Sequence, residues 1–289
     1  MDAAKLAMFY NRIENSKVHC FLCPHNCVIK PGGIGTCRVR KNVDGDLYSL
    51  NYGKITAMAL DPIEKKPLYC FKPGSKILSV GTFGCNLKCS FCQNWEIAHE
   101  NPEVYNITPE ELLKKAESYI QQGNIGIAYT YNEPSIWYEF VYDTAKLVKD
   151  AGLSNVLVTN GFIGIKAIEK LLPYVDAMNI DVKAFTASFY SDICKATLDN
   201  VKETVEVSAG KCHVEVTTLV IPTLNDALQE ISNLCKWLSR ISPEIPLHLS
   251  RYFPNYRMNY IPQTPVETLE KARTEALKYL KYVYLGNVW

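Results

Sequence analysis

From Lys76 to its end, the 289-residue chain alternates strand-like and helix-like segments, and this alternation restricts the fold more than any other feature. Short apolar runs typical of buried strands are separated by longer runs with helical periodicity. The expected strands are residues 76–82, 124–131, 155–160, 177–182, 213–221, 246–252 and 282–288. Strands that alternate with helices form parallel sheets with right-handed crossovers. We therefore predict the α/β class and a partial (β/α)6 barrel, with its chemistry at the carboxyl ends of the strands.

Start signals for helices support this interpretation. Residues 108–111, Thr-Pro-Glu-Glu, combine an N-cap, a proline at the first helical position and a capping glutamate. Residues 264–267, Thr-Pro-Val-Glu, repeat the pattern. Asn225 or Asp226 is expected to cap another helix. The apolar stripe of that helix would comprise Leu228, Ile231, Leu234, Cys235 and Leu238.

Residues 1–75 have a different character. They are rich in cysteine, glycine and turn signals, and residues 38–53 read as a β-hairpin. We expect an N-terminal Cys-rich extension over residues 1–75 and the partial barrel over residues 76–289.

Charge and hydropathy restrict the partners. The net charge is +1, which gives no electrostatic footprint for nucleic acid. The longest apolar runs are strand-length, so we expect no transmembrane helix and no membrane partner. The first residues lack the apolar core of a signal peptide. The expected location is the cytoplasm.

The eleven cysteines fall into a revealing pattern. Seven lie in two tight groups, and the other four are scattered as Cys70, Cys194, Cys212 and Cys235. Clustered cysteines in a reducing compartment indicate metal ligands more than disulfides.

The first group follows the first expected strand directly, as Cys85-x3-Cys89-x2-Cys92. Four cysteines normally close a [4Fe–4S] cluster, so three leave one iron open to another ligand. A zinc knuckle is the alternative, but structural zinc sites are closed and four-coordinate. This loop therefore predicts a [4Fe–4S] cluster with one free coordination position.

Several longer runs resemble a known family. They are Cys23–Cys27, Gly35–Arg40, Asp61–Tyr69, Phe71–Gly74, the three-cysteine loop and Tyr129–Pro134. Together they resemble the pyruvate formate-lyase activating enzymes of the radical S-adenosylmethionine (SAM) superfamily, and more narrowly the AmmeMemoRadiSam group. The resemblance implies a TIM-like barrel of the radical SAM type, with SAM bound at the open iron. Gly84 would let the loop wrap closely, and Phe91 would shield the cluster.

The resemblance also assigns SAM contacts. Tyr131-Asn132-Glu133-Pro134 matches a Gly-Gly-Glu-Pro run whose residues meet the SAM amino group. The further implied contacts are Thr159, Asn160, Asp181, Lys183 and His248. Each has a structural alternative: Glu133 as a charge at a helix N-terminus, Asp181 with Lys183 as a plain ion pair, and His248 as a core residue. Cys70 departs from the pattern, which has histidine there.

The second group, Cys20-x2-Cys23-x3-Cys27-x9-Cys37, offers four thiolates. They suit a structural zinc ion, and equally a second [4Fe–4S] cluster, while unliganded thiols are the remaining alternative. A small, loop-rich segment gains folding free energy from bound metal. His25 is expected outside the ligand set.

The resemblance implies an oxidoreductase that reductively cleaves SAM under anaerobic conditions and forms a 5′-deoxyadenosyl radical for hydrogen abstraction. A flavodoxin- or ferredoxin-like protein would donate the electron. The substrate would be a glycyl radical enzyme or, in an AmmeMemoRadiSam-type enzyme, a small molecule or another protein. A non-enzymatic electron-transfer or metal-storage protein is the third alternative.

Overall fold

The computed structural model describes residues 5–288, and its centre is one eight-stranded sheet. The sheet order is β16-β15-β14-β13-β12-β11-β9-β8. Neighbouring strands from β9 to β16 run parallel, and β8 joins antiparallel to β9. The strands are β8 Ala57–Pro62, β9 Lys76–Gly81, β11 Asn124–Tyr129, β12 Ser154–Thr159, β13 Ala177–Asp181, β14 His213–Val220, β15 Leu247–Arg251 and β16 Val283–Gly286. All seven expected strands are confirmed, and β8 is an addition.

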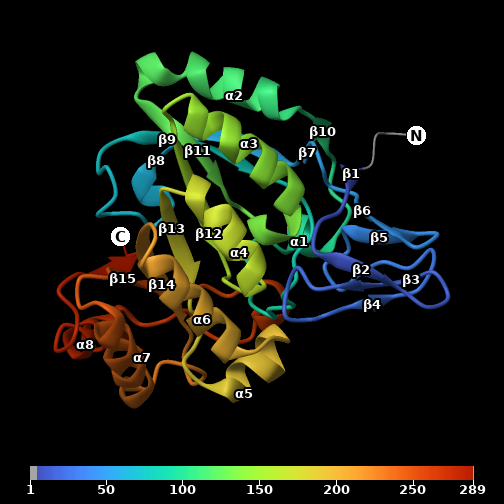
Figure 1. Cartoon of the computed structure of the whole chain (residues 1–289). Coiled ribbons are helices and arrows are strands. Elements are labelled where there is room, and N and C mark those ends of the chain that lie inside the picture. The colour runs from blue at the N-terminus through green and yellow to red at the C-terminus, as the bar shows by residue number, and fades with distance from the viewer. Residues whose placement is uncertain (1–4, 289) are drawn as a thin grey trace.

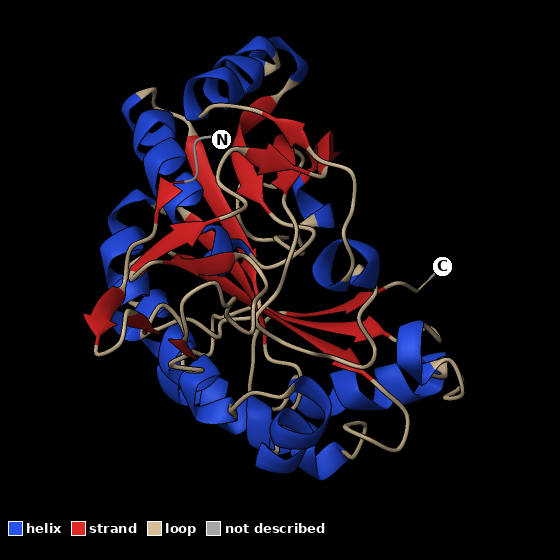
Figure 2. Ribbon diagram, turned by 90° about the vertical axis from the view of Figure 1, so that its right-hand side faces the viewer, coloured by secondary structure: helices blue, strands red, loops and turns tan. Residues whose placement is uncertain are grey.

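Helices cover the outer side of this curved sheet, and loops fill its inner side (Figures 1 and 2). Because β8 and β16 are its two edges, the sheet forms an open barrel, as expected. The covering helices are α2 Pro109–Ser118, α3 Tyr138–Asp150, α4 Ile165–Leu171, α6 Leu198–Ala209, α7 Leu228–Ile241 and α8 Val266–Ala276. Shorter helices are η1 Ile63–Lys65, α1 Trp95–His99, η2 Ile120–Gln122, η3 Pro134–Trp137, η4 Leu172–Tyr174, α5 Ala187–Phe189, the π-helix η5 Tyr190–Cys194 and η6 Tyr256–Met258. Of the helices in residues 5–288, none combines the length and apolar character that crossing a bilayer requires.

One expected helix cap is confirmed and two are wrong. The Thr108 hydroxyl accepts from Glu111 N, and Thr108 N donates to the Glu111 carboxylate, which completes a capping box for α2. Thr264 does not cap α8. Its hydroxyl instead donates to Val220 O at 2.6 Å and accepts from Tyr252 N, and Pro265 takes the N-cap position.

The expected cap of α7 at Asn225 or Asp226 is also wrong, since Ala227 is the N-cap. Asn225 Oδ1 accepts from Ile221 N at 2.6 Å, and Asp226 Oδ1 accepts from Thr223 N at 2.9 Å. Both side chains therefore hold the turn before the helix, which removes them from the helix terminus.

The extension contains two small antiparallel sheets. One has the order β1-β6-β5 (Lys5–Leu6, Asp46–Ser49, Arg40–Val43), and the other has the order β2-β3-β4 (Tyr10–Ile13, Lys17–Cys20, Val28–Ile29). The predicted hairpin is confirmed as β5–β6, and its turn residues Asp44 and Gly45 both have positive φ, as a two-residue type I′ turn needs. A third pair, β7 Lys54–Ile55 with β10 Tyr105–Asn106, ties the extension to the segment before α2.

A buried ion pair joins the extension to the barrel. Arg40 Nη2 of β5 lies 2.5 Å from Glu139 Oε1 of α3, and both side chains are 1% exposed. The same carboxylate oxygen accepts from Met8 N at 2.7 Å, and Arg40 Nη1 donates to Met8 O. Two charges taken out of water are thus compensated by each other and by the backbone of the extension.

Replacing Arg40 by methionine should therefore lower the free energy of unfolding by about 3–5 kcal/mol, because it leaves the Glu139 carboxylate buried without its cation. Urea unfolding followed by circular dichroism measures the change. Arg12→Met is the matched control, since Arg12 pairs with Asp46 on the surface, where its side chain is 68% exposed. Equal losses in the two variants would contradict the assignment.

Candidate active site

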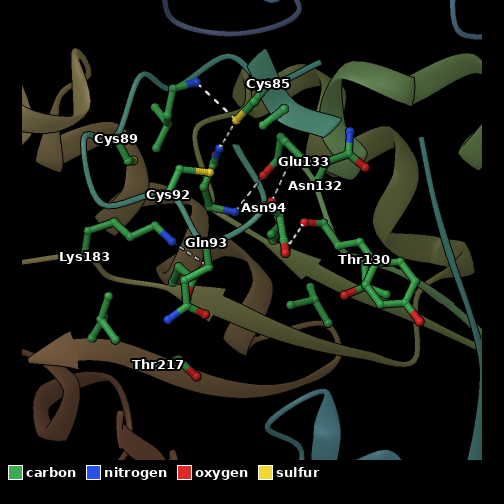
Figure 3. Close-up of a pocket in the computed structure, with 18 of the residues that line it drawn as sticks. Cys85, Cys89, Cys92, Gln93, Asn94, Thr130, Asn132, Glu133, Lys183 and Thr217 are labelled. Atoms are coloured by element: carbon green, nitrogen blue, oxygen red, sulfur yellow. Dashed lines mark hydrogen bonds and ion pairs between the residues drawn. The ribbon is translucent and has the colours of Figure 1, made fainter. Parts of the chain in front are cut away.

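A cavity of about 510 Å³ opens at the carboxyl ends of the barrel strands. Figure 3 shows the cysteines of the three-cysteine loop along one side of it, with Glu133 and Lys183 on opposite sides. The sequence-predicted residues that line it are Cys85, Cys89, Phe91, Cys92, Asn132, Glu133, Thr159, Asn160, Asp181 and Lys183. Its volume lies within the range of small-molecule and cofactor sites. Of the residues predicted for the cluster and SAM sites, Gly84 and His248 lie outside this lining in the described part of the chain.

The cluster loop, residues 81–94, is fastened from two sides. Asn132, after β11, accepts from Thr82 N at 3.0 Å and donates to Gly84 O at 2.8 Å. On the other side the extension packs against Gly84, whose φ is 89°. A Cβ added to Gly84 would lie 2.7 Å from Cys37 O and from Val39 Cγ1. Glycine is therefore required here by both the backbone conformation and the close approach of the extension.

Three buried or half-buried thiols of this loop face the cavity. Burial raises the pKa of Cys85, and it raises the pKa of Cys92 to about 11. A hydrogen bond with Cys194, together with burial, raises the pKa of Cys89. Among residues 5–288, no three Cys, His, Asp or Glu side chains already stand close enough together to hold a metal ion. The fit to an iron–sulfur cluster therefore rests on the donor set: three thiols from one short loop, aligned on one cavity, with an aromatic shield in Phe91.

Glu133 is a buried carboxylate that joins two strand ends. It follows β11, is 2% exposed, and caps η3 by accepting from Ser135 N. It also accepts from Thr159 Oγ1 and Asn160 N, both at 2.7 Å, at the end of β12. Burial nevertheless raises the pKa of Glu133. A carboxylate offers about four acceptor positions and three are used, so one position on Oε2 is left for a donor in the cavity.

Asn160 connects this carboxylate to the cluster loop. Its Nδ2 donates to Asn86 Oδ1 at 2.9 Å and lies 3.7 Å from Cys85 Sγ, while Asn86 Nδ2 donates to Phe162 O. A hydrogen bond to a ligand sulfur is one of the means by which proteins adjust iron–sulfur clusters.

Asp181 and Lys183 form an ion pair at the end of β13. Lys183 Nζ lies 2.6 Å from Asp181 Oδ2, and both residues line the cavity. Although burial opposes the ammonium, the neighbouring carboxylate holds the pKa of Lys183 above its usual value. The ammonium stays charged and has further protons to donate.

His248 lies below the cavity, in a buried group around Glu215. Its Nε2 is 2.6 Å from Glu215 Oε2, and the other carboxylate oxygen receives His213 Nε2 and Cys70 N. Despite burial, these hydrogen bonds lower the pKa of Glu215 to about 2. Cys70 Sγ lies 3.4 Å from Tyr284 OH, so the cysteine that departs from the family pattern belongs to this group and not to the cluster loop.

One wall of the cavity was not predicted from the sequence. Asp61, Lys65 and Lys66 come from the segment around β8 and line it. Asp61 receives Lys66 Nζ at 2.9 Å and Tyr131 OH at 3.0 Å. Burial opposes the charge of Asp61, but these hydrogen bonds lower its pKa to about 2. Only the family resemblance of Asp61–Tyr69 could have indicated this wall, because no periodic pattern marks it.

Three cysteines of the extension, Cys20, Cys23 and Cys27, lie between the end of β3 and the start of β4, and Cys37 follows in the turn before β5. Cys20, Cys23 and Cys37 are buried and Cys27 is half-buried. Burial is the main cause that raises the pKa of each buried thiol, and repulsion from the other thiols of the group adds to it. His25 points elsewhere: its Nε2 is 2.7 Å from Asn86 O in the cluster loop.

Comparison with known proteins identifies the superfamily. The family description "Radical SAM superfamily" matches residues 79–237, more than half of the chain. An uncharacterized protein of Methanocaldococcus jannaschii is 44% identical over 288 residues, covering 98% of this chain and 85% of that protein. A second protein of that organism, provisionally named a glycyl-radical enzyme activating enzyme, is 30% identical over 209 residues, covering 70% of this chain and 77% of that protein.

A pyruvate formate-lyase-activating enzyme of Clostridium pasteurianum is 27% identical over 218 residues, which is 68% of this chain and 87% of that enzyme. Among solved structures, Streptococcus suis SuiB bound to S-adenosylmethionine has a TM-score of 0.58 at 11% identity, covering 73% of this chain and 51% of SuiB. Spore photoproduct lyase has a TM-score of 0.56 at 12% identity, covering 79% of each chain. These two similarities concern the fold.

The chain therefore belongs to the radical SAM superfamily, and it is an enzyme of radical chemistry. Within the superfamily it is related to the pyruvate formate-lyase activating enzymes.

Asn132→Ala should weaken cluster binding, because it removes the two hydrogen bonds that hold the cluster loop at Thr82 and Gly84. Residues that support metal ligands typically change metal affinity by about 10–100-fold, so we expect roughly tenfold weaker iron binding on reconstitution. Iron content and visible absorbance measure it. Asn233→Ala, on the exposed face of α7, is the control. Unchanged iron binding in Asn132→Ala would contradict the supporting role.

Proposed function

We propose that the protein reductively cleaves S-adenosylmethionine and uses the resulting 5′-deoxyadenosyl radical to take a hydrogen atom from a glycine of a partner protein. The observation that carries the proposal is the cavity itself, in which three cysteines of one loop face Glu133 and the Asp181–Lys183 pair at the strand ends. The similarity to activating enzymes supports the choice of substrate.

A [4Fe–4S] cluster held by Cys85, Cys89 and Cys92 would supply the electron that breaks the sulfonium C–S bond of SAM. The residues of the chain bind and orient. The free acceptor position of Glu133 suits the SAM ammonium group, and a positive neighbour would favour the carboxylate form that burial disfavours. Lys183 suits the SAM carboxylate.

Other residues hold these groups in place. Thr159 and Asn160 fix the Glu133 carboxylate through their hydrogen bonds, and they are the proposed rim of the SAM site. Phe91, 4% exposed and packed on Phe189, excludes water from the cluster side. His248 is left out of the proposed SAM contacts, because Glu215 occupies its Nε2 below the cavity.

Anaerobically reconstituted protein reduced with dithionite should form 5′-deoxyadenosine and methionine from SAM, and Cys89→Ala should form none. Liquid chromatography of the products measures this. Cys235→Ala is the matched control, because Cys235 is buried in α7 away from the cavity and its loss should leave cleavage intact. Persistent cleavage of SAM by the Cys89→Ala variant would refute the proposal.

The substrate is tested in the same assay. Pyruvate formate-lyase labelled with deuterated glycine should transfer deuterium to 5′-deoxyadenosine if a glycine is the hydrogen donor. Efficient cleavage with unlabelled 5′-deoxyadenosine would favour the second candidate, an AmmeMemoRadiSam-type enzyme that acts on a small molecule or another protein. A relative that is similar over nearly the whole chain is an uncharacterized protein, so its name does not favour a glycyl radical enzyme as the substrate.

We propose further that the four cysteines of the extension hold a structural zinc ion. Three of the four thiols are buried within the small, loop-rich extension, where a bound metal would add folding free energy. Burial raises the pKa of Cys20 and Cys37, and the buried guanidinium of Arg40 opposes part of this shift, in the direction of the thiolate forms that zinc binding requires.

The zinc site can be tested without interference from the catalytic cluster. A variant with Cys85, Cys89 and Cys92 all replaced by alanine should retain about one zinc ion per chain and no iron, as a closed four-thiolate site predicts. Elemental analysis with sulfide determination measures this. Adding Cys20→Ala and Cys23→Ala should remove the zinc. Iron and sulfide retained in the triple variant would identify a second cluster instead.

A further inference from the structure

A stack of aromatic side chains lies on the surface beside the cluster loop. Trp95 and His99 of α1 are four residues apart, so they share one face of the helix. Both stack on Tyr256, with ring centroids 5.3 and 5.8 Å away. Backbone and side-chain hydrogen bonds fasten this second segment to the cluster loop: Arg257 N donates to Ser90 O, and Asn255 Nδ2 donates to Gln93 O. The β15–α8 segment therefore lies alongside the cluster loop (Figure 1).

Three cations from separate parts of the chain converge on this stack. They are Arg38 of the extension, Lys88 of the cluster loop and Arg257 of the β15–α8 segment. Burial, followed by the charges of these three side chains, lowers the pKa of His99 to about 4. Arg38 donates to the neutral amide of Asn101, and the Arg257 guanidinium lies over the Tyr256 ring. Neither contact neutralises the charge of the arginine.

The exposed carboxylates of α1 point away from this stack. Glu96 and Glu100 are exposed, but each is one position beyond Trp95 or His99, which turns it about 100° away from the aromatic stack. Asp192 is exposed on η5, and the exposed Lys195, three residues later, carries the opposite charge. A basic surface with aromatic groups thus adjoins the loop that carries Cys85, Cys89 and Cys92.

We propose that this surface, formed by Arg38, Lys88, Trp95, Tyr256 and Arg257, binds an acidic one-electron carrier protein. The inference rests on the proposed function, because each cleavage of SAM consumes one electron that must reach the cluster loop from outside. Arginine and aromatic residues are enriched in protein interfaces, and complementary charge speeds the encounter of the partners. The carrier is oxidised by one electron and leaves, so a charge-steered, readily dissociating complex suits the task.

The double variant Arg38→Gln/Arg257→Gln tests the proposal with reduced flavodoxin, an acidic carrier, as electron donor. Removing two cations that steer encounter should lower kcat/KM for flavodoxin about tenfold at low salt and flatten its salt dependence. Dithionite, a small reductant that needs no docking surface, should support SAM cleavage within about twofold of the native rate in both proteins, because the cavity is unchanged. Arg240→Gln/Lys211→Gln is the control, with two exposed cations removed at the amino-terminal end of the barrel.

Each alternative result overturns the proposal in a recognisable way. Equal flavodoxin kinetics in the native protein and the Arg38/Arg257 variant, or equal losses in the control, would refute the docking surface alone. Loss of dithionite-driven cleavage in the variant would assign the two arginines to the cluster site. Intact flavodoxin-driven cleavage with lost hydrogen abstraction from a protein substrate would assign the surface to that substrate. Failure of the native protein with dithionite would refute the proposed function as well.

Discussion

The arrangement of the active site depends on one buried carboxylate. Glu133 accepts hydrogen bonds from its own turn and from the end of the neighbouring strand, so it sets the distance between the ends of β11 and β12. Asn160, one of its donors, then reaches Asn86 and Cys85 in the cluster loop. A carboxylate without partners in this position would be costly to bury, and its partners are the residues that shape the cavity. The same hydrogen bonds therefore position the cluster loop and stabilise the barrel.

Much of the fold could be predicted because it follows from local patterns. Buried parallel strands are continuous apolar runs, and all seven were found in this way. Strand β8 was missed because Ala57–Pro62 ends in Asp-Pro and has no alternation that marks a strand. The helix caps at Thr264 and Asn225 failed for another reason. Their side chains have partners contributed by other turns of the chain, and local sequence does not specify such partners.

The same distinction applies to the site. The cysteine spacing and the polar residues at strand ends are local signals, and the structure brings the cluster-loop cysteines, Glu133, Asp181 and Lys183 around one cavity. Asp61 and Lys66 belong to the cavity only because β8 pairs with β9, which no spacing shows. Glu215 reads as one polar residue in a buried strand, yet it gathers two histidines and the backbone of Tyr69 and Cys70. The segment from Asp61 to Cys70 therefore contacts both the mouth of the barrel and the layer below it.

The ion pair between Arg40 and Glu139 also bears on the order of folding. The two residues are 99 positions apart, so during synthesis the extension emerges well before its partner helix α3. Until α3 is present, the Arg40 guanidinium must stay hydrated, and the extension cannot close around it. Contacts between such distant residues form late, after the loop-closure entropy has been overcome. The extension is thus made before α3, and its ion pair cannot form until synthesis has passed α3, which follows β9 and β11 in the chain.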